Sequence, residues 1–187
     1  PSGLIPLWLR EENGTPFGGD PRRALAFIVE RYKALGLTPV MAMELEFYLY
    51  DPSNARPVAP VSPVTGKRLD ADAVLSIDEL DDFGGFFRDI YAACEAQGVP
   101  ADSAIAENGI GQFEINLLHV DDPLRAADDA VLFKRIVRGL ARKHGFAASF
   151  MAKPYGERSG SGLHVHFSLL DRDGNNVFND GSADGSV

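Results

Sequence analysis

The sequence contains one cysteine and lacks any long apolar run. A single cysteine, Cys94, excludes an internal disulfide framework, and its position in a helical apolar pattern predicts a buried thiol. There is no stretch of 18 apolar residues to suggest a membrane span. No secretory signal peptide is recognisable. Together these absences predict a cytoplasmic protein with no membrane partner.

Positive charge is also scarce. The 18 Lys and Arg residues are outnumbered by 27 Asp and Glu, which leaves a net charge of −9. This balance argues against a nucleic-acid partner, because binding of a phosphate backbone requires a basic face. A phosphate-bearing ligand stays compatible with an acidic chain if metal ions bridge the two. The 187 residues, 45% of them hydrophobic, suffice for a globular domain with a core.

Both ends resemble cuts within a longer polypeptide. The first residue is Pro1 instead of Met, and the last segment, "NDGSADGSV", consists of turn-forming residues. We therefore expect residues 1–187 to be part of a larger protein.

Helical and strand patterns are interleaved along the chain. Helices are predicted from Pro21 with Asp20 as N-cap, over 82–97 with Asp82 as cap and Gly98 as stop, and over 123–144. Strands are predicted at 43–50, in two pieces between 103 and 120, and on both sides of a Gly/Ser loop at 146–154 and 162–171. Residues 51–70, with four prolines, read as a long excursion, and "DRDGNN" as a hairpin turn. Because strict βαβ alternation is absent, we predict an α+β fold with a mainly antiparallel sheet and helices on one face.

Three of the predicted strands place polar side chains on one face and apolar side chains on the other. The apolar row of the last strand is Leu163, Val165, Phe167 and Leu169, and all three apolar faces are expected to lie under the helices. The polar rows are Glu44, Glu46 and Tyr48, then Gln112, Glu114 and Asn116, then His164, His166 and Ser168.

An ordinary solvated sheet face is the simplest explanation for any one of these strands. Taken together, however, the three faces carry Glu and His but no Lys or Arg. Like charges at contact distance repel by about 1 kcal/mol per pair even in water. Such a face therefore favours a bound cation, and carboxylates with few imidazoles suit Mg²⁺ or Mn²⁺ better than zinc. Glu107, just before "NGIG", is a further candidate ligand.

A glycine-rich segment leads directly into the His-x-His strand. In "KPYGERSGSGLHVHFS", residues 153–168, Gly160 and Gly162 allow close approach of the backbone to a ligand. Lys153 and Arg158 are the positive groups nearby. The segment lacks the Gly-Lys-Ser/Thr and the following helix of a P-loop.

These segments resemble the catalytic domain of the glutamine synthetase family. "ELE" at 44–46, "ENGIGQFEIN" at 107–116 and "KPYGERSGSGLHVHFS" at 153–168 are similar to three successive family signatures, in the family's order. The resemblance covers about residues 17–180. It implies a partial catalytic domain, from which the small N-terminal domain and the C-terminal part are absent.

The resemblance also implies a pair of metal ions. Glu46, Glu107 and Glu114 match the ligands of the ion nearest the substrate carboxylate and the amine. Glu44 and His164 match ligands of the ion that sits against the ATP phosphates.

Other residues match substrate contacts. His166 and Ser168 match residues on the ATP side, and Gly160 matches the loop glycine that meets the substrate glutamate. No catalytic residue of the chain can be named from the resemblance. The partners it implies are glutamate, an amine or ammonia, and ATP, within a homo-oligomeric ring of the full-length protein.

The implied reaction is ATP-dependent formation of a γ-glutamyl amide through a γ-glutamyl phosphate. "GQFEINLLHV" and "ERSGSGLHVHFSLLD" look more like γ-glutamylpolyamine and related amine ligases than ammonia-using enzymes, and Ser159 stands where the latter usually have Asn. Ammonia remains an alternative acceptor. A divalent-metal hydrolase or oxygenase, and a non-catalytic metal-binding domain, are the alternatives from other classes. The 187 residues alone are expected to be inactive.

Overall fold

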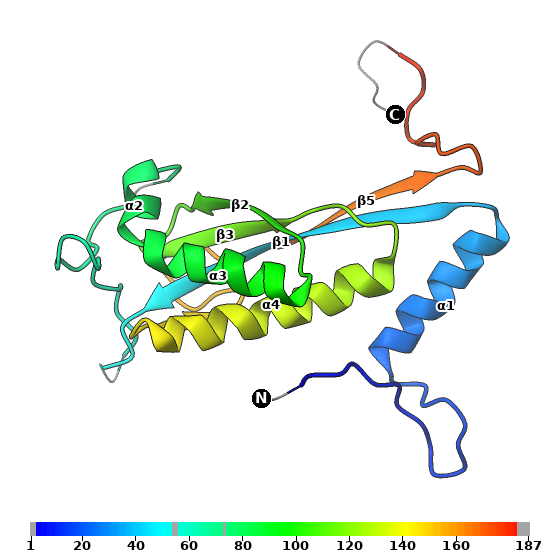
Figure 1. The fold of residues 1–187 in the computed structure, drawn as a ribbon, viewed down its shortest axis with the longest axis horizontal. Coiled ribbons are helices and arrows are strands. Elements are labelled where there is room, and N and C mark those ends of the chain that lie inside the picture. Colours follow the sequence, from blue (N-terminus) through cyan, green and yellow to red (C-terminus); the bar gives the residue numbers. More distant parts are fainter. Residues whose placement is uncertain (1–2, 54–55, 73, 183–187) are drawn as a thin grey trace. The chain divides into compact units, whose positions relative to one another are not determined.

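The computed structural model describes residues 3–53, 56–72 and 74–182. Residues 54–55 of the predicted excursion and 183–187 of the closing turn-rich segment lie outside this description. In chain order the elements are α1 (Pro21–Ala34), β1 (Thr38–Tyr50), α2 (Ile77–Asp82), α3 (Gly84–Gln97), β2 (Ala101–Ala106), β3 (Gln112–Leu117), α4 (Pro123–Lys143), β4 (Ala147–Ser149) and β5 (Leu163–Leu170) (Figure 1).

The strands form a five-stranded sheet in the order β2-β3-β1-β4, with β5 also paired to β1. β1 runs antiparallel to both β3 and β4, and β2 runs antiparallel to β3. The sheet is open, and the α+β class predicted from the sequence is confirmed. Among the described residues, no helix has the length and apolarity needed to cross a bilayer.

The chain divides into two compact units. The first comprises Pro1–Met41, His119–Asp128 and His166–Val187, and the second comprises Ala42–Leu118 and Asp129–Val165. The elements β1, α4 and β5 each pass from one unit into the other.

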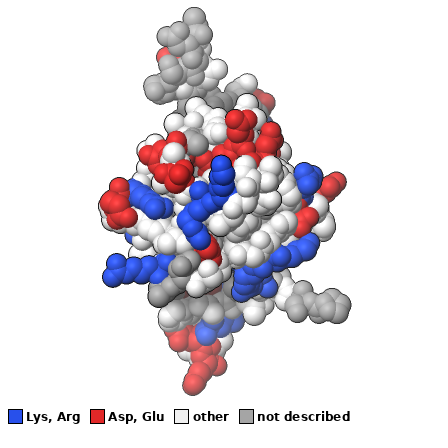
Figure 2. All heavy atoms as spheres, turned by 90° about the vertical axis from the view of Figure 1, so that its left-hand side faces the viewer, with Lys and Arg blue, Asp and Glu red and all other residues white. Residues whose placement is uncertain are grey.

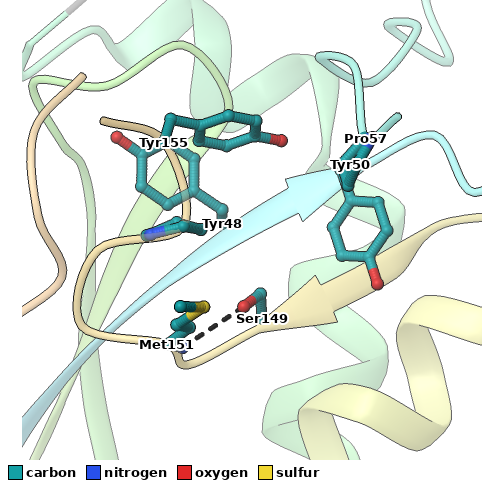
Figure 3. A pocket seen from close by; sticks show the side chains of 7 residues that line it. Tyr48, Tyr50, Pro57, Ser149, Met151 and Tyr155 are labelled. Atoms are coloured by element: carbon teal, nitrogen blue, oxygen red, sulfur yellow. Dashed lines mark hydrogen bonds between the residues drawn. The ribbon is translucent and has the colours of Figure 1, made fainter. Parts of the chain in front are cut away.

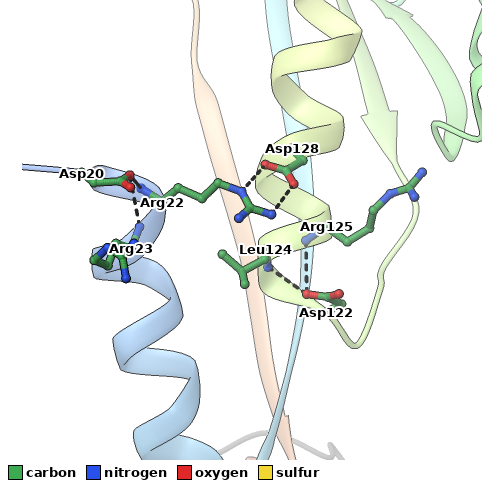
Figure 4. Close-up of polar contacts among 7 residues, drawn as sticks. All are labelled: Asp20, Arg22, Arg23, Asp122, Leu124, Arg125 and Asp128. Carbon is green, nitrogen blue, oxygen red and sulfur yellow. Dashed lines mark hydrogen bonds and ion pairs between the residues drawn. The ribbon is translucent and has the colours of Figure 1, made fainter. Parts of the chain in front are cut away.

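The first unit contains α1 and the first turn of α4 (Figure 4). Asp20 caps α1, because its Oδ1 accepts hydrogen bonds from the backbone N–H groups of Arg22 and Arg23. Asp122 caps α4 in the same way, accepting from the backbone of Leu124 and Arg125. The Asp20 cap agrees with the sequence prediction, and each cap satisfies backbone donors that a helix start leaves open.

A bidentate ion pair joins these two helices within the first unit. The Arg22 guanidinium donates to both carboxylate oxygens of Asp128, at 3.0 and 2.9 Å (Figure 4). This hydrogen bond raises the pKa of Arg22. The same guanidinium lies 4.1 Å from the centre of the Trp8 ring, a cation–π geometry.

An aromatic core fills the second unit between the sheet and α3. Phe47 of β1 and Phe113 of β3 are fully buried, with ring centres 6.3 Å apart. Phe113 packs edge-on against Phe83 at 5.3 Å and Phe87 at 5.2 Å, and Phe47 packs against Phe86 at 6.5 Å. The apolar rows of β1 and β3 therefore face the helices, as their alternation predicts. Their polar rows consequently point to the other side of the sheet.

Cys94 lies in the same core. Its side chain is buried on α3, which confirms the predicted buried thiol. Burial raises the pKa of this thiol to about 11, so it stays protonated at neutral pH.

The start of the second predicted helix is wrong. Asp82 does not cap the helix that follows; it is the last residue of the short helix α2, whose N-cap is Ser76. Phe83 separates α2 from α3, and its fully buried ring is held by Phe113 and Phe146. The packing of this aromatic ring sets the break between the two helices. The local capping sequence gives no information about that packing. The predicted stop at Gly98 is confirmed by its left-handed backbone.

The prediction that the apolar row of β5 lies under helices is also wrong for most of its length. Leu163 is 52% exposed, Val165 50% and Phe167 41%, and Leu169 alone of the row is buried. Among the described strands β5 pairs with β1 only, so it lacks the neighbours that bury a central strand. The turn after β5 is confirmed at Gly174, although its second arm forms an isolated bridge between Leu170 and Asn176 instead of a strand.

The charged side chains are mixed on the face shown in Figure 2. Acidic and basic groups lie next to one another there, with uncharged atoms between them. The net charge of −9 therefore does not make this face uniformly acidic.

Candidate metal and substrate site

The polar faces of β1 and β3 meet in register within the second unit. Glu46 lies directly opposite Glu114, Glu44 opposite Asn116, and Tyr48 opposite Gln112. Residues that face each other in an antiparallel pair have Cβ atoms about 5 Å apart. The pairing therefore brings Glu46 and Glu114, which are 68 positions apart in the sequence, to adjacent places on one face.

His164 from β5 joins this face. One ligand atom from each of Glu44, Glu114 and His164 lies within 4.8 Å of the others, a spacing that could hold a metal ion. The Nδ1 atom of His164 is 2.9 Å from Glu44 Oε2. Glu114 is 6% exposed, whereas His164 is exposed, so the cluster extends from the sheet to the surface.

The electrostatics of the cluster show that its carboxylates are short of positive charge. Burial, followed by the charge of Glu44, raises the pKa of Glu114. Burial and the charge of Glu46 raise the pKa of Glu107. Glu107 therefore interacts electrostatically with the carboxylates of the cluster. The hydrogen bond to Glu44 raises the pKa of His164. A bound cation would favour the charged form of these carboxylates. The donor set of carboxylates with one imidazole fits Mg²⁺ or Mn²⁺.

The glycine-rich loop, residues 159–162, lies against this face. The Tyr48 hydroxyl donates to the Ser159 carbonyl at 2.8 Å. The Glu46 N–H donates to the Gly162 carbonyl at 3.2 Å, and the Ser161 N–H donates to the Ala152 carbonyl at 2.8 Å. The loop is therefore fastened both to β1 and to the segment that follows β4.

Two glycines of this loop stand where a Cβ would meet a close neighbour. A Cβ at Gly160 would lie 2.8 Å from the Ala152 carbonyl oxygen, closer than real Cβ contacts. A Cβ at Gly162 would lie 2.8 Å from both Glu46 Oε1 and His164 Nε2. The absence of side chains at these two residues is what lets the loop, Glu46 and His164 come together.

The structure thus brings Glu44, Glu46, Glu114 and His164 onto one face, with Gly160 in the adjacent loop. The two residues predicted on the ATP side, His166 and Ser168, belong to the first unit. Within that unit the His166 ring lies 6.0 Å from the His119 ring.

The two predicted positive groups have structural contacts of their own. The Arg158 guanidinium lies 4.5 Å from the centre of the Tyr155 ring, and the Lys153 ammonium donates to the Arg158 carbonyl. Tyr155 in turn packs edge-on against Tyr48 at 5.2 Å. Tyr48, Tyr155 and Met151 line a cavity of about 150 Å³ (Figure 3).

Sequence reasoning missed the polar residues that hold the site together. Gln112, Tyr48 and Asn108 each hydrogen-bond to the loop or to a neighbouring carboxylate. Gln112 and Tyr48 were placed on the polar face by strand alternation, but their chemistry gave no sign of a role. The two residues face each other across β1 and β3, a pairing that only the folded sheet shows.

Comparison with protein families identifies the class to which this fold and site belong. Residues 18–187 match the family model "Glutamine synthetase, catalytic domain". The chain belongs to the glutamine synthetase family, and the resemblance carried by the three sequence segments is confirmed.

The curated relatives include both amine ligases and glutamine synthetases. The chain is 42% identical over 187 residues to gamma-glutamylputrescine synthetase PuuA of Escherichia coli (strain K12), covering 98% of this chain and 40% of that protein. It is 36% identical to glutamate–isopropylamine ligase of a Pseudomonas species, covering 89% of this chain and 36% of that protein. It is 35% identical to glutamine synthetase of Halobacterium salinarum, covering 91% of this chain and 36% of that protein. The chain therefore spans 36–40% of the length of these relatives.

Solved structures give the same fold. The GmaS/ADP complex superposes with a TM-score of 0.80 at 28% identity, covering 93% of this chain and 39% of that chain. A structure described as a novel glutamine synthase homolog superposes with a TM-score of 0.78 at 28% identity, covering 96% of this chain and 39% of that chain.

Proposed function

We propose that the full-length protein is an ATP-dependent ligase that joins the γ-carboxylate of glutamate to an amine. The observation that carries this proposal is the cluster of Glu44, Glu114 and His164 beside the 159–162 loop, in a chain of the glutamine synthetase family. The two amine-ligase relatives, at 42% and 36% identity, support an amine as acceptor. Residues 1–187 then form part of the catalytic domain.

In this proposal the acidic face holds two divalent ions, Mg²⁺ or Mn²⁺. Glu46, Glu107 and Glu114 hold the ion on the substrate side, and Glu44 and His164 hold the ion on the ATP side. Glu114, whose ligand atom lies within 4.8 Å of those of Glu44 and His164, then stands where the two ion sites meet. The ions supply positive charge that offsets the phosphates and the substrate carboxylate. Glu44 and Glu46 lie about 7 Å apart along β1, from the rise of about 3.4 Å per residue, a separation that suits two neighbouring ions.

The reaction takes place in two steps. The γ-carboxylate oxygen of glutamate attacks the γ-phosphorus of ATP, forming γ-glutamyl phosphate and releasing ADP. The amine nitrogen then attacks the acyl carbon, phosphate leaves with the bonding electron pair, and the nitrogen loses a proton. A carboxylate does not react directly with an amine at neutral pH, so the first step supplies the leaving group. The protein's part is to position the reactants and stabilise their charge.

The chain's own residues fill the remaining positions. Gly160 presents its backbone to the glutamate, and the glycine at this place permits the close approach described above. His166 and Ser168 bind on the ATP side. The full-length protein is proposed to assemble as a homo-oligomeric ring, and a cytoplasmic location remains a prediction.

The test is phosphate release by the full-length protein with glutamate, ATP and Mg²⁺. Putrescine, isopropylamine, ethanolamine and ammonia are supplied separately at equal free-base concentration. We expect an alkylamine to stimulate release at least about tenfold more than ammonia, a difference of about 1.4 kcal/mol in activation free energy. Stronger stimulation by ammonia would identify a glutamine synthetase. If no acceptor supports phosphate release, the ligase assignment is refuted and a non-catalytic metal-binding protein is favoured.

A further inference from the structure

A buried carboxamide joins the acidic face to the glycine-rich loop. Gln112, the first residue of β3, is 1% exposed. Its Nε2 donates to Glu46 Oε2 at 2.9 Å and to the Gly160 carbonyl at 2.8 Å, and lies 3.3 Å from Ser161 Oγ. Its Oε1 accepts from the backbone N–H of Gly109 at 3.0 Å. Both amide hydrogens and the amide oxygen therefore have partners.

These partners allow one orientation of the amide. A carboxylate and a backbone carbonyl can only accept, whereas a backbone N–H can only donate. Turning the amide by 180° would set Oε1 against Glu46 and against the Gly160 carbonyl, and would leave the Gly109 N–H facing an NH₂ group. Each buried group left without a partner costs about 1–3 kcal/mol. The Gln112 side chain is thus fixed in both position and direction.

Glu46 depends on the same contact. Its Oε2 is held by Gln112, its backbone N–H by the Gly162 carbonyl, and its Oε1 points toward the space left by the absent Cβ of Gly162. With Oε2 held by this neutral donor, Oε1 is left beside the space that His164 Nε2 also borders. Gln112 therefore determines how the Glu46 carboxylate is presented on the face.

Gly160 is held by the second amide hydrogen. Its carbonyl accepts from Gln112, and its Cα lies so close to the Ala152 carbonyl that a Cβ would not fit. A single NH₂ group thus sets the distance between the loop backbone and the Glu46 carboxylate.

We infer that Gln112 is a positioning residue that couples the Glu46 carboxylate to the 159–162 loop, so that metal binding and glutamate binding depend on one another. The inference rests on the proposed function, in which Glu46 holds an ion and Gly160 meets the substrate glutamate. Gln112 acts through these two residues. Changes to a residue hydrogen-bonded to a metal ligand typically cost about 10–100-fold in metal affinity or activity.

The test uses Gln112→Met in the full-length protein, since Met keeps the length of the side chain and loses its hydrogen-bonding groups. Binding of Mn²⁺ alone is followed by the electron paramagnetic resonance signal of the free ion, which requires no turnover. We expect the dissociation constant for Mn²⁺ to rise about 10–100-fold, and the KM for glutamate to rise with it.

A matched control separates this role from a general loss of stability. Val137 is fully buried on α4, and Val137→Ala weakens the core without altering a polar contact of the site. We expect this variant to lose thermal stability and to keep wild-type constants for Mn²⁺ and glutamate. The inference is wrong if Gln112→Met keeps both wild-type constants, or if Val137→Ala raises both to the same extent.

Two further outcomes are distinguishable. If the wild-type protein binds no Mn²⁺, the proposed metal site fails and the inference fails with it. If Gln112→Met does not fold, Gln112→Glu retains the length and the acceptor for Gly109 but offers no donor to the Gly160 carbonyl. An unchanged KM for glutamate in that variant would overturn the inference.

Discussion

Glu46 on β1 and Glu114 on β3 are paired directly across the antiparallel register. Like charges placed opposite one another destabilise a sheet, and here Glu114 is also buried. Burial and the neighbouring carboxylates raise the pKa of Glu114, so the charged form is disfavoured in the metal-free fold. The arrangement lowers the folding stability, and in the proposed function it supplies two carboxylate ligands for metal ions.

Glu114→Gln is therefore expected to act in opposite directions on stability and on metal binding. Without metal, the variant should be more stable at pH 8 by about 1 kcal/mol, because one of the facing charges is removed. With Mn²⁺ it should gain less stability than the wild type, since a ligand is lost. Thermal melting with and without Mn²⁺ measures both effects. A variant that is less stable without metal and equally stabilised by Mn²⁺ would contradict the site.

Gly162→Ala should weaken metal binding while the fold survives. The new Cβ would meet Glu46 Oε1 and His164 Nε2 at 2.8 Å, and both atoms are at the ends of side chains that can move aside. We expect Mn²⁺ affinity to fall at least about tenfold with a melting temperature close to wild type. Gly156→Ala is the control, because a Cβ at Gly156 has no atom within 4 Å. Equal effects of the two substitutions would refute the close packing at Gly162.

Glu79 should make the stability of the protein depend on pH. Its side chain is buried on α2, Oε1 has no hydrogen-bond partner within the described part of the chain, and burial raises its pKa to about 7 from an ordinary value of 4.5. Between pH 4.5 and 7 the folded protein keeps a proton that the unfolded chain releases, so stability falls as pH rises through this window.

The loss at Glu79 amounts to about 3 kcal/mol at most. Glu79→Gln, which stays neutral, should flatten the slope of stability against pH. Urea unfolding at pH 5, 6, 7 and 8 measures the slope, and Glu95→Gln on the exposed side of α3 is the control. An unchanged slope in Glu79→Gln would show that Glu79 ionises normally.

Tyr48→Phe should loosen the 159–162 loop. The Tyr48 hydroxyl is buried and donates to the Ser159 carbonyl at 2.8 Å, and its removal leaves that acceptor without this partner. We expect a loss of about 1–3 kcal/mol in stability and a higher KM for glutamate, with kcat largely retained. Tyr91→Phe on α3 removes a hydroxyl elsewhere in the second unit and should leave the KM unchanged.

Strand alternation predicted the shared face because period two is a local property of the chain. The side chains of Glu44 and Glu46 must point to one side of β1, and those of Gln112 and Glu114 to one side of β3, whichever strands are neighbours. The register that sets Glu46 against Glu114 is not local. It depends on contacts between distant parts of the chain, such as the hydrogen bond that the Leu49 N–H of β1 donates to the Gly111 carbonyl at 2.9 Å.

Tertiary packing explains the predictions that were wrong. Asp82 carries a good capping side chain, yet the burial of Phe83 places the helix break one residue later. Leu163 and Val165 alternate as core residues should, yet they are exposed because alternation does not say whether a neighbouring element covers the strand. The side-chain hydrogen bonds of Gln112 could not be predicted from the sequence either, because all their partners except Gly109 are at least 48 positions away.

Most anchors of the 159–162 loop lie in the strands, in Tyr48, Gln112 and the backbone of Glu46, and one more is the Ala152 carbonyl after β4. The loop's shape is therefore encoded mostly outside the loop. The side chain of Ser159, whose hydroxyl contacts Asn108, can therefore be substituted without a change in the backbone conformation. Side chains of the loop that face outward can therefore be changed independently of the strands that hold its backbone in place.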